Sequence, residues 1–415
     1  MRGGVESGYA WVRLGAAVLI STIGGVGLWS VVVILPTIQA EFGVARGDAS
    51  LPYTVSTLCI MVGGLPLGRI ADRHGAFATM AIGGLALGGG YVLSGLTATL
   101  WQFTLVQGLL IGLLGSAATF SPLVADVSLW FNRRRGIAVA IAASGNYLAG
   151  TVWPPIVEHL VEEVGWRHAQ FAIGVFCVAT ILPLALVLRR RAPVRDMARD
   201  TAAAGAAAAG LGVPAGLLQG LLVAAAVMCC VAMSMPQVHI VAYCAGLGYG
   251  PARGAEMLSV MLGTGVISRL ASGWIADRIG GLRTLLLGSV LQALSLLLYV
   301  PFDGLASLYL ISALFGLSQG GIVPSYAVIV RDYFPPREAG LRISLVLSGT
   351  LGGMALGGWL SGVLFDLTGG YRAAFLNGVA WNLMHIAIAA WLVLRARRGG
   401  GAFRLPTRMD ATAAP

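Results

Sequence analysis

The sequence contains no lysine, and only 11% of its 415 residues are charged. A soluble domain carries about 25% charged residues, whereas 57% of this chain is hydrophobic. A soluble core cannot bury that much apolar surface, so the composition indicates a protein that crosses a membrane many times. The apolar runs do not alternate with polar residues as in membrane barrels, and we therefore expect the crossings to be helices.

Motifs of enzymes and of ATP use are also missing. There is no phosphate-binding G-x-x-x-x-G-K-[ST] loop and no H-E-x-x-H zinc motif. The five cysteines lie in or beside apolar runs without the spacing of metal ligands, which is typical of free thiols. We expect no enzyme activity, no cofactor and no metal site. The net charge of +10 comes from arginines in short loops, which favours a lipid bilayer over nucleic acid as the partner.

One eight-residue pattern, G-x-x-A-D-R-x-G, occurs twice. The copies run from Gly68 to Gly75 and from Gly273 to Gly280, 205 residues apart. Each copy separates two apolar runs, and a charged turn with glycines at that place predicts a tight hairpin at the membrane surface. Two copies in equivalent places predict an internally duplicated protein, which is the plan of many secondary transporters.

The apolar runs predict an all-α membrane protein with twelve transmembrane helices in two pseudo-symmetric six-helix bundles. The predicted spans are residues 12–36, 50–70, 77–97, 99–129, 136–160, 167–188, 215–243, 251–275, 283–302, 305–330, 341–365 and 372–394. They divide the chain into an N-terminal bundle (1–189), a cytoplasmic linker (190–213), a C-terminal bundle (214–395) and a basic cytoplasmic tail (396–415).

The arginines are distributed unevenly between the two predicted sides of the membrane. With the N-terminus inside, 22 arginines, Arg13 among them, lie on the inner side, and the outer side holds only Arg46, Arg167, Arg253 and Arg372. Arginine-rich loops stay in the cytoplasm, so both termini are predicted to be cytoplasmic. Arginine without lysine, with abundant alanine and glycine, is typical of a GC-rich bacterial genome. We expect a multi-pass protein of the bacterial inner (plasma) membrane that functions as a monomer.

Two six-helix halves with a G-x-x-A-D-R-x-G turn after helices two and eight resemble the major facilitator superfamily. Within it, the chain is similar to the monocarboxylate transporter and oxalate/formate antiporter branch. The stretch from Glu6 to Trp11 resembles the acidic-G-G-aromatic-small-W motif of monocarboxylate carriers, and the stretch from Trp130 to Gly145 resembles their helix-five block. Arg269 lies where that branch has its helix-eight arginine. The resemblance implies the major facilitator fold and transport of a small carboxylate.

The sequence departs from that branch at several charged positions. The carriers' helix-eight aspartate falls on Gly265, and their helix-one lysine falls near Trp29 and Ser30. The helix-eleven lysine of the oxalate exchanger has no counterpart, since lysine is absent. The resemblance therefore leaves open whether protons or a counter-anion accompany the substrate, and whether the protein is a symporter or an antiporter.

Arg269 is the strongest candidate for a substrate-binding residue. It lies about 10 Å from the inner end of its predicted helix at 1.5 Å per residue. A mid-helix arginine usually faces a cavity or a partner, because its insertion costs about 2.5–3.5 kcal/mol. The equivalent position in the first half is Gly64, so the arginine is not part of the repeated scaffold. The structural alternatives are snorkelling to the inner surface and pairing with Asp277.

Six other residues could complete a carboxylate site with Arg269. They are polar or aromatic and lie within predicted helices: Asn146, Tyr147, Trp29, His239, Gln319 and Tyr326. The structural alternative is hydrogen bonding between helices for the polar residues and lipid-facing bulk for Trp29. His239 could also carry a proton, although a histidine near the interface is more often a hydrogen-bonded structural residue. His385 and Asn382 lie on the twelfth span, an outer helix of that architecture, and are left out.

Charged residues at the inner ends of the helices are predicted to act as gates rather than to touch substrate. Four of them belong to the repeated turns: Asp72, Arg73, Asp277 and Arg278. Asp126, near the inner end of the fourth span, is expected to join them through Arg133 to Arg135. Together they would hold the inner side closed.

The leading hypothesis is a secondary active transporter of a small organic anion, above all a monocarboxylate, that works by alternating access. One alternative is a major facilitator carrier of a drug-like or uncharged solute, although helix five lacks the G-P-x-x-G-G run of drug/proton antiporters. Another alternative is a membrane receptor or scaffold that binds without turnover. Counterflow in proteoliposomes separates the three, since a receptor gives no exchange and a drug exporter ignores small acids.

The arginine distribution makes a testable prediction about orientation. Alkaline phosphatase fused after Arg199 should be inactive, and green fluorescent protein at the same site should fluoresce. The reason is that 22 of the 26 loop arginines are cytoplasmic in this orientation. An active phosphatase together with a dark fluorescent protein would contradict it.

Overall fold

The computed structural model describes residues 6–131, 135–190, 212–334 and 336–398. Its regular structure in these ranges is helical, without a strand. The helices of the first half are α1 (Gly8–Gly24), α2 (Val26–Val33), α3 (Leu35–Phe42), α4 (Arg46–Ala49), α5 (Leu51–His74), α6 (Ala76–Ser94), α7 (Leu100–Val106), η1 (Gln107–Ser116), α8 (Ser121–Trp130) and α9 (Arg135–Leu186). Those of the second half are α11 (Ala215–Gly246), α12 (Pro251–Ile279), α13 (Gly281–Leu298), α14 (Leu305–Gln319), α15 (Ile322–Tyr333), α16 (Pro336–Thr368) and α17 (Arg372–Arg398).

Twelve apolar crossings can be followed through these helices. Ten helical stretches of the described chain are long and apolar enough to span a membrane. One of them, α9, turns back at Gly165 (φ 78°, ψ 156°) and supplies two crossings. The shorter apolar stretch of α7 and η1, continued by α8, supplies the last one. The predicted fold class, an all-α membrane protein with twelve transmembrane helices, is confirmed.

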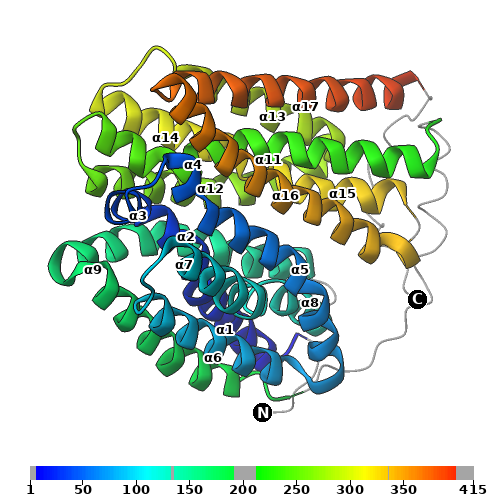
Figure 1. Ribbon diagram of the computed structural model, residues 1–415. Coiled ribbons are helices and arrows are strands. Elements are labelled where there is room, and N and C mark those ends of the chain that lie inside the picture. The colour runs from blue at the N-terminus through cyan, green and yellow to red at the C-terminus, as the bar shows by residue number, and fades with distance from the viewer. Residues whose placement is uncertain (1–5, 132–134, 191–211, 335, 399–415) are drawn as a thin grey trace.

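The helices form two bundles that lie side by side. Figure 1 shows the blue-to-green helices α1–α9 on one side and the green-to-red helices α11–α17 on the other. The bundles touch along α9 with α12 and along α5 with α16. We call the end of the molecule that holds the repeated turns the Gly75 end, and the opposite end, where α9 turns back, the Gly165 end.

The repeated motif forms the same turn in both bundles. Gly75 (φ 88°, ψ 162°) ends α5 and precedes α6, and Gly280 (φ 83°, ψ 158°) ends α12 and precedes α13. Only glycine enters this backbone region without strain, which explains why both copies of the motif close on glycine. The hairpin predicted from the two copies is confirmed.

Three predicted spans, the first, the fourth and the tenth, differ from the structure near their ends or in their middle. The first, predicted as 12–36, is a series of three helices, α1 to α3, that begins at Gly8 and ends at Phe42. The fourth, predicted as 99–129, has the π-helical η1 in its middle. The predicted linker, 190–213, and tail, 396–415, fall almost entirely outside the described residues, so the domain boundaries stay predictions.

The tenth span, predicted as a continuous 305–330, is broken between α14 and α15 by Gly320 and Gly321. A side-chain carbon added at Gly320 would lie 2.3 Å from the backbone oxygen of Gly265, and one added at Gly321 would lie 1.9 Å from the hydroxyl of Ser272. Both contacts are on α12. The two glycines therefore allow the chain to pass close to α12 beside Arg269.

Arg13 of α1 is buried at the Gly75 end, with 1% of its surface exposed, although the arginine count assigns it to the inner loops. Its Nε and Nη2 donate to the two carboxylate oxygens of Asp126 on α8, each over 2.7 Å. Its Nη1 donates to the backbone oxygen of Arg190 over 3.1 Å and to the hydroxyl of Tyr9 over 3.3 Å. This ion pair fastens α1, α8 and the segment after α9 to one another.

Breaking this ion pair from one side should destabilise the fold strongly. Asp126→Asn leaves the buried guanidinium of Arg13 without a counter-charge, which typically costs about 3–5 kcal/mol. The double variant Arg13→Met/Asp126→Leu removes both charges and should unfold at a higher temperature than Asp126→Asn. Thermal unfolding of the purified proteins in detergent measures this order. Equal melting temperatures for the two variants would contradict a clamp that depends on the pair.

Candidate functional site

Arg269 lies on α12 at the contact between the bundles, with 8% of its surface exposed. Its Nη1 donates over 2.8 Å to the backbone oxygen of Ala143 on α9, and its Nε donates over a long 3.4 Å to that of Gly320. The guanidinium also lies 4.1 Å from the centroid of the Tyr147 ring. Arg269 has no ion-pair partner among the described side chains, which do not include that of Asp277. The guanidinium thus reaches across to the first bundle.

Tyr147 of α9 fills the space next to Arg269. A side-chain carbon added at Gly265 on α12 would lie 2.6 Å from the Tyr147 ring. An aspartate at this position, where the carriers have one, would therefore collide with the ring. A cation against an aromatic face gains about 0.5–2 kcal/mol. The Tyr147 ring therefore compensates part of the Arg269 charge, in place of the carboxylate that the sequence lacks at position 265.

Trp29 and Asn146 make a second contact in this region of the first bundle. The indole Nε1 of Trp29 donates over 3.1 Å to the backbone oxygen of Asn146, and 1% of the Trp29 surface is exposed. A carbon added at Gly150 would lie 2.8 Å from the indole and 2.1 Å from Leu262 on α12. Trp29 is therefore buried beside the contact between the bundles and does not face lipid.

Two buried glutamines of the second bundle leave polar atoms without partners. Nε2 of Gln237 on α11 donates over 2.8 Å to Oε1 of Gln319 on α14. Among the described residues, Gln237 Oε1, Gln319 Nε2 and the hydroxyl of Tyr53 on α5 have no hydrogen-bond partner. Such buried atoms are rare and indicate water or a ligand. Tyr53 belongs to no motif, so the sequence did not identify it.

Tyr326 is bonded within the interior of the second bundle. Its hydroxyl lies 3.1 Å from Nε2 of His385 on α17 and 3.4 Å from the sulfur of Cys229 on α11. All three residues are buried, and Nδ1 of His385 has no partner in the described part of the chain. His385, left out as a residue of an outer helix, therefore faces the interior of its bundle.

His239 of α11 is fully buried towards the Gly165 end, and both of its ring nitrogens are engaged. Nε2 lies 2.7 Å from the backbone oxygen of Gly358 on α16, and Nδ1 lies 3.0 Å from the hydroxyl of Tyr371. A carbonyl only accepts, so in the neutral ring Nε2 carries the hydrogen and Nδ1 accepts from Tyr371. This geometry matches the structural alternative for His239, since no nitrogen is left for a substrate.

Tyr371 is also contacted by a residue of the first bundle. Nη1 of Arg46 on α4 donates over 3.1 Å to the Tyr371 hydroxyl, and its guanidinium lies 4.2 Å from the centroid of the Phe365 ring on α16. The Asp366 carboxylate accepts from the backbone amides of Arg46 and Gly47 over 2.9 and 2.7 Å. We call these five residues the Arg46 latch. It joins the two bundles at the Gly165 end.

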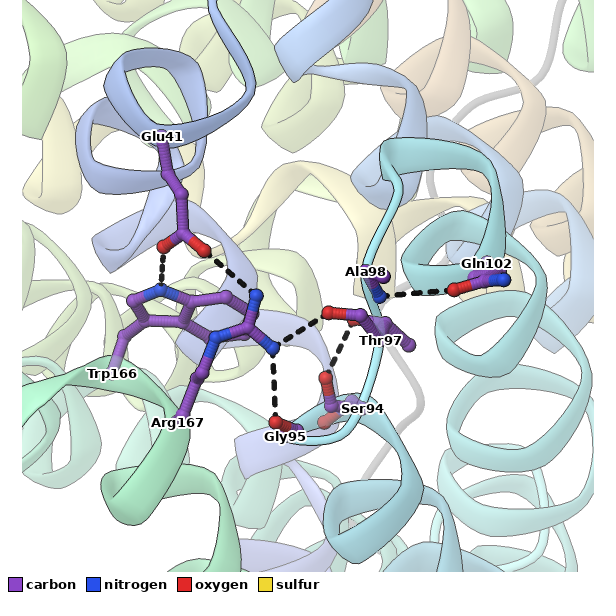
Figure 2. A network of polar contacts seen from close by, with 8 residues as sticks. All are labelled: Glu41, Ser94, Gly95, Thr97, Ala98, Gln102, Trp166 and Arg167. Atoms are coloured by element: carbon purple, nitrogen blue, oxygen red, sulfur yellow. Dashed lines mark hydrogen bonds and ion pairs between the residues drawn. The ribbon is translucent and has the colours of Figure 1, made fainter.

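The sequence offered one signal for the latch, which is the similarity of Gly165–Ala169 (GWRHA) to Gly370–Ala374 (GYRAA), 205 residues further on. Trp166, equivalent to Tyr371, binds the end of α3 within the first bundle: its indole donates to one carboxylate oxygen of Glu41, and Arg167 donates to the other over 2.7 Å (Figure 2). Burial raises the pKa of Glu41, but the hydrogen bonds from Trp166 and Arg167 outweigh it and lower that pKa. At the Gly165 end, each repeat thus holds the end of a helix in place, the first through Trp166 and Arg167 and the second through the latch. Of the two, the second is the one that contacts the other bundle.

Asp126 is expected to act in gating with Arg133 to Arg135. The structure pairs it with Arg13 of the same bundle, and the side chains of Arg133 to Arg135 are not among those described, so a contact with them stays a prediction. This pair joins helices of one bundle and does not bridge the two. The sequence missed it because Arg13 lies 113 residues away, with no motif in common.

The other gating candidates lie on the repeated turns of the Gly75 end. The side chains of Asp72 and Asp277 are not among those described. Arg73 is exposed, and the guanidinium of Arg278 lies 3.2 Å from the ring centroid of Trp274. Gating by these residues stays a prediction.

Comparison with known proteins gives the relationship of the chain. Residues 17–306 and 254–408 match the family described as Major Facilitator Superfamily. The chain is 27% identical to monocarboxylate transporter 13 of Rattus norvegicus, covering 77% of this chain and 74% of that protein. It is 29% identical to monocarboxylate transporter 11 of Mus musculus, covering 90% and 85%.

Among solved structures, the chain is similar to a bacterial homologue of the human lysosomal transporter Spinster in its inward-facing, occupied conformation. The TM-score is 0.72 at 14% identity, over 94% of this chain and 98% of that one. The resemblance found in the sequence is confirmed. The chain is a transporter rather than an enzyme, and it belongs to the major facilitator superfamily.

Proposed function

We propose that the chain is a secondary active transporter of a small organic anion, namely a monocarboxylate, and that it works by alternating access. The observation that carries this proposal is Arg269, a buried arginine at the contact between the bundles without an ion-pair partner among the described side chains. A charge in such a place is costly unless a partner neutralises it. An arriving carboxylate supplies that partner.

The surroundings of Arg269 support a small carboxylate as substrate. A guanidinium can donate two parallel hydrogen bonds to a carboxylate. Nη1 and Nε of Arg269 donate only to backbone oxygens, which a carboxylate can replace, and the bond from Nε to Gly320 is long. The buried rings of Tyr147, against Arg269, and of Trp29, near α12, leave little room for a bulky substrate there. The relatives named monocarboxylate transporters 11 and 13 support the same substrate class.

Arg269 also connects substrate binding with movement of the bundles. It belongs to the second bundle but donates to Ala143 of the first. A carboxylate that takes over this donor changes a contact between the two, so binding and rearrangement are coupled. In carriers built from two repeats, a site between the bundles opens to one side at a time.

The orientation inferred from the arginines supports a conformer that is closed to the outside. It puts the Gly165 end, which the Arg46 latch closes, on the periplasmic face of a bacterial inner membrane. Both termini and the linker 190–213 then lie in the cytoplasm, between an N-terminal bundle of residues 1–189 and a C-terminal bundle of residues 214–395. Release of the latch is one step of the transport cycle.

The test of the substrate site is replacement of Arg269. Arg269→Lys should weaken carboxylate binding at least about tenfold, because an ammonium cannot reproduce the two parallel hydrogen bonds. Arg269→Ala should abolish counterflow of labelled monocarboxylate in proteoliposomes, and an amide or ester of the substrate should not compete. The exposed Arg283 at the Gly75 end provides the control, and Arg283→Ala should exchange like the wild type. Near-normal affinity in Arg269→Ala would place the anion site elsewhere.

The latch can be tested by distance measurement. Leu96 and Phe302 are exposed on connections at the Gly165 end, one in each bundle. Spin labels at Leu96→Cys and Phe302→Cys, in a background without native cysteines, should lie further apart in a larger fraction of molecules when Arg46→Ala or Asp366→Asn is added. Arg372→Ala, which alters an exposed arginine of the same end, should leave the distances unchanged. Wild-type distances in both latch variants would remove this role.

A further inference from the structure

A small pocket lies between the two bundles at the Gly165 end, and its lining is acidic. Its volume is about 180 Å³. The part of α9 before Gly165 and the start of α12 line it with Pro155, Glu158, His159, Glu162, Ala252 and Glu256. None of these residues belongs to the Arg46 latch or is bonded to Arg269, so the proposed transport function does not account for the pocket.

Glu158 differs from the other carboxylates that the helices bury. Only 5% of its surface is exposed, and it forms no hydrogen bond or ion pair with any described residue. By contrast, Asp126 pairs with Arg13, and even the half-exposed Glu256 pairs with Arg253. A carboxylate that has no donor from the protein, and that meets water only through a small acidic pocket, is costly to keep charged. Binding of a ligand or a proton therefore stabilises Glu158.

The groups that face Glu158 bring no free positive charge. On its own helix it faces Glu162 and His159, both exposed to solvent. Across the pocket α12 brings Glu256, and the guanidinium of Arg253 is already 3.0 Å from that carboxylate. Closing the pocket thus gathers acidic groups from both bundles.

The other helices around α9 do not change this balance. Behind α12, Tyr309 of α14 donates its hydroxyl to Glu256 and adds no charge. The helices α2 and α6, which pack on α9, contain no charged residue, and the only charges of α1 and α8 are Arg13 and Asp126, paired with each other at the Gly75 end. No group of three or more His, Cys, Asp or Glu residues in the described chain could hold a metal ion. The group that fits Glu158 is a proton.

We infer that Glu158 is a proton-binding site, and that its protonation favours closure of the Gly165 end. Opening separates α9 from α12 and admits water, which stabilises the carboxylate. Closure excludes water and brings Glu256 towards Glu158 and Glu162, which stabilises the neutral acid. Because the closed form holds the proton more tightly, the closed fraction rises as the pH falls and declines as the pH rises. The pH on the Gly165 side thereby sets how often that side opens, whatever the substrate.

The labels at Leu96→Cys and Phe302→Cys test this inference in lipid nanodiscs without substrate. The closed-to-open ratio of the wild type should fall by up to about tenfold for each pH unit over which one linked proton is lost, between about pH 5 and about pH 9. Glu158→Gln imitates the neutral acid and should stay closed across that range. Glu163→Gln alters an exposed glutamate of the same helix outside the pocket and should keep the wild-type pH dependence.

Glu158→Asp shows whether loss of the response follows loss of the carboxyl group or a defect in folding, since it keeps the acid and should keep a pH dependence. The inference is overturned if the wild-type ratio does not change with pH, or if Glu158→Gln responds as the wild type does. A ratio that follows sodium or potassium concentration at constant pH, and not the pH, also overturns it. Since no arm uses transport, absence of carboxylate counterflow would count against the Arg269 site alone.

Discussion

The cost of an unpaired charge among apolar helices is the constraint on which this structure depends. Neither lipid nor a packed bundle can solvate a guanidinium or a carboxylate as water does. Asp126 therefore binds Arg13 through both oxygens. At the surface, the exposed Asp366 accepts from the two backbone amides at the start of α4. In a chain with few charges, these contacts become the points at which helices and bundles are fastened.

The same constraint applies to Arg269 and Glu158, the two buried charged groups that have no ion-pair partner in the described chain. Arg269 compensates its charge with backbone oxygens and the Tyr147 ring, and Glu158 lies in an acidic pocket without a donor. Both lie where α9 of the first bundle meets α12 of the second. A ligand that satisfied either group would act on the contact that changes when the bundles move, so the proposed anion site and the proposed proton site share one contact between the bundles.

The internal duplication supplies the scaffold, and the proposed anion site and the Arg46 latch lie where the two halves differ. Gly75 and Gly280 make the same turn in both bundles. Trp166 and Tyr371 are equivalent in the repeat, yet Trp166 binds within its own bundle while Tyr371 accepts from Arg46 of the other. Arg269 likewise has only Gly64 as its counterpart. The repeated turns, with their gating candidates, recur in both halves, whereas Arg269 and the contact between Tyr371 and Arg46 occur once.

The sequence by itself determined the membrane class, the number of spans, the repeated turns and the family, because these follow from local hydrophobicity, glycine conformation and motif spacing. It also made Arg269 a candidate for the anion site, since a lone arginine in an apolar run is conspicuous without any knowledge of its neighbours. It could not show that Tyr147 occupies the space above Gly265, that both nitrogens of His239 are engaged, or that Glu158 has no donor. Those facts depend on which helices meet. The tertiary structure alone decided them, because Asp126 lies 113 residues from Arg13 and Asp366 lies 320 from Arg46, and only docking of the helices and bundles brings such partners together.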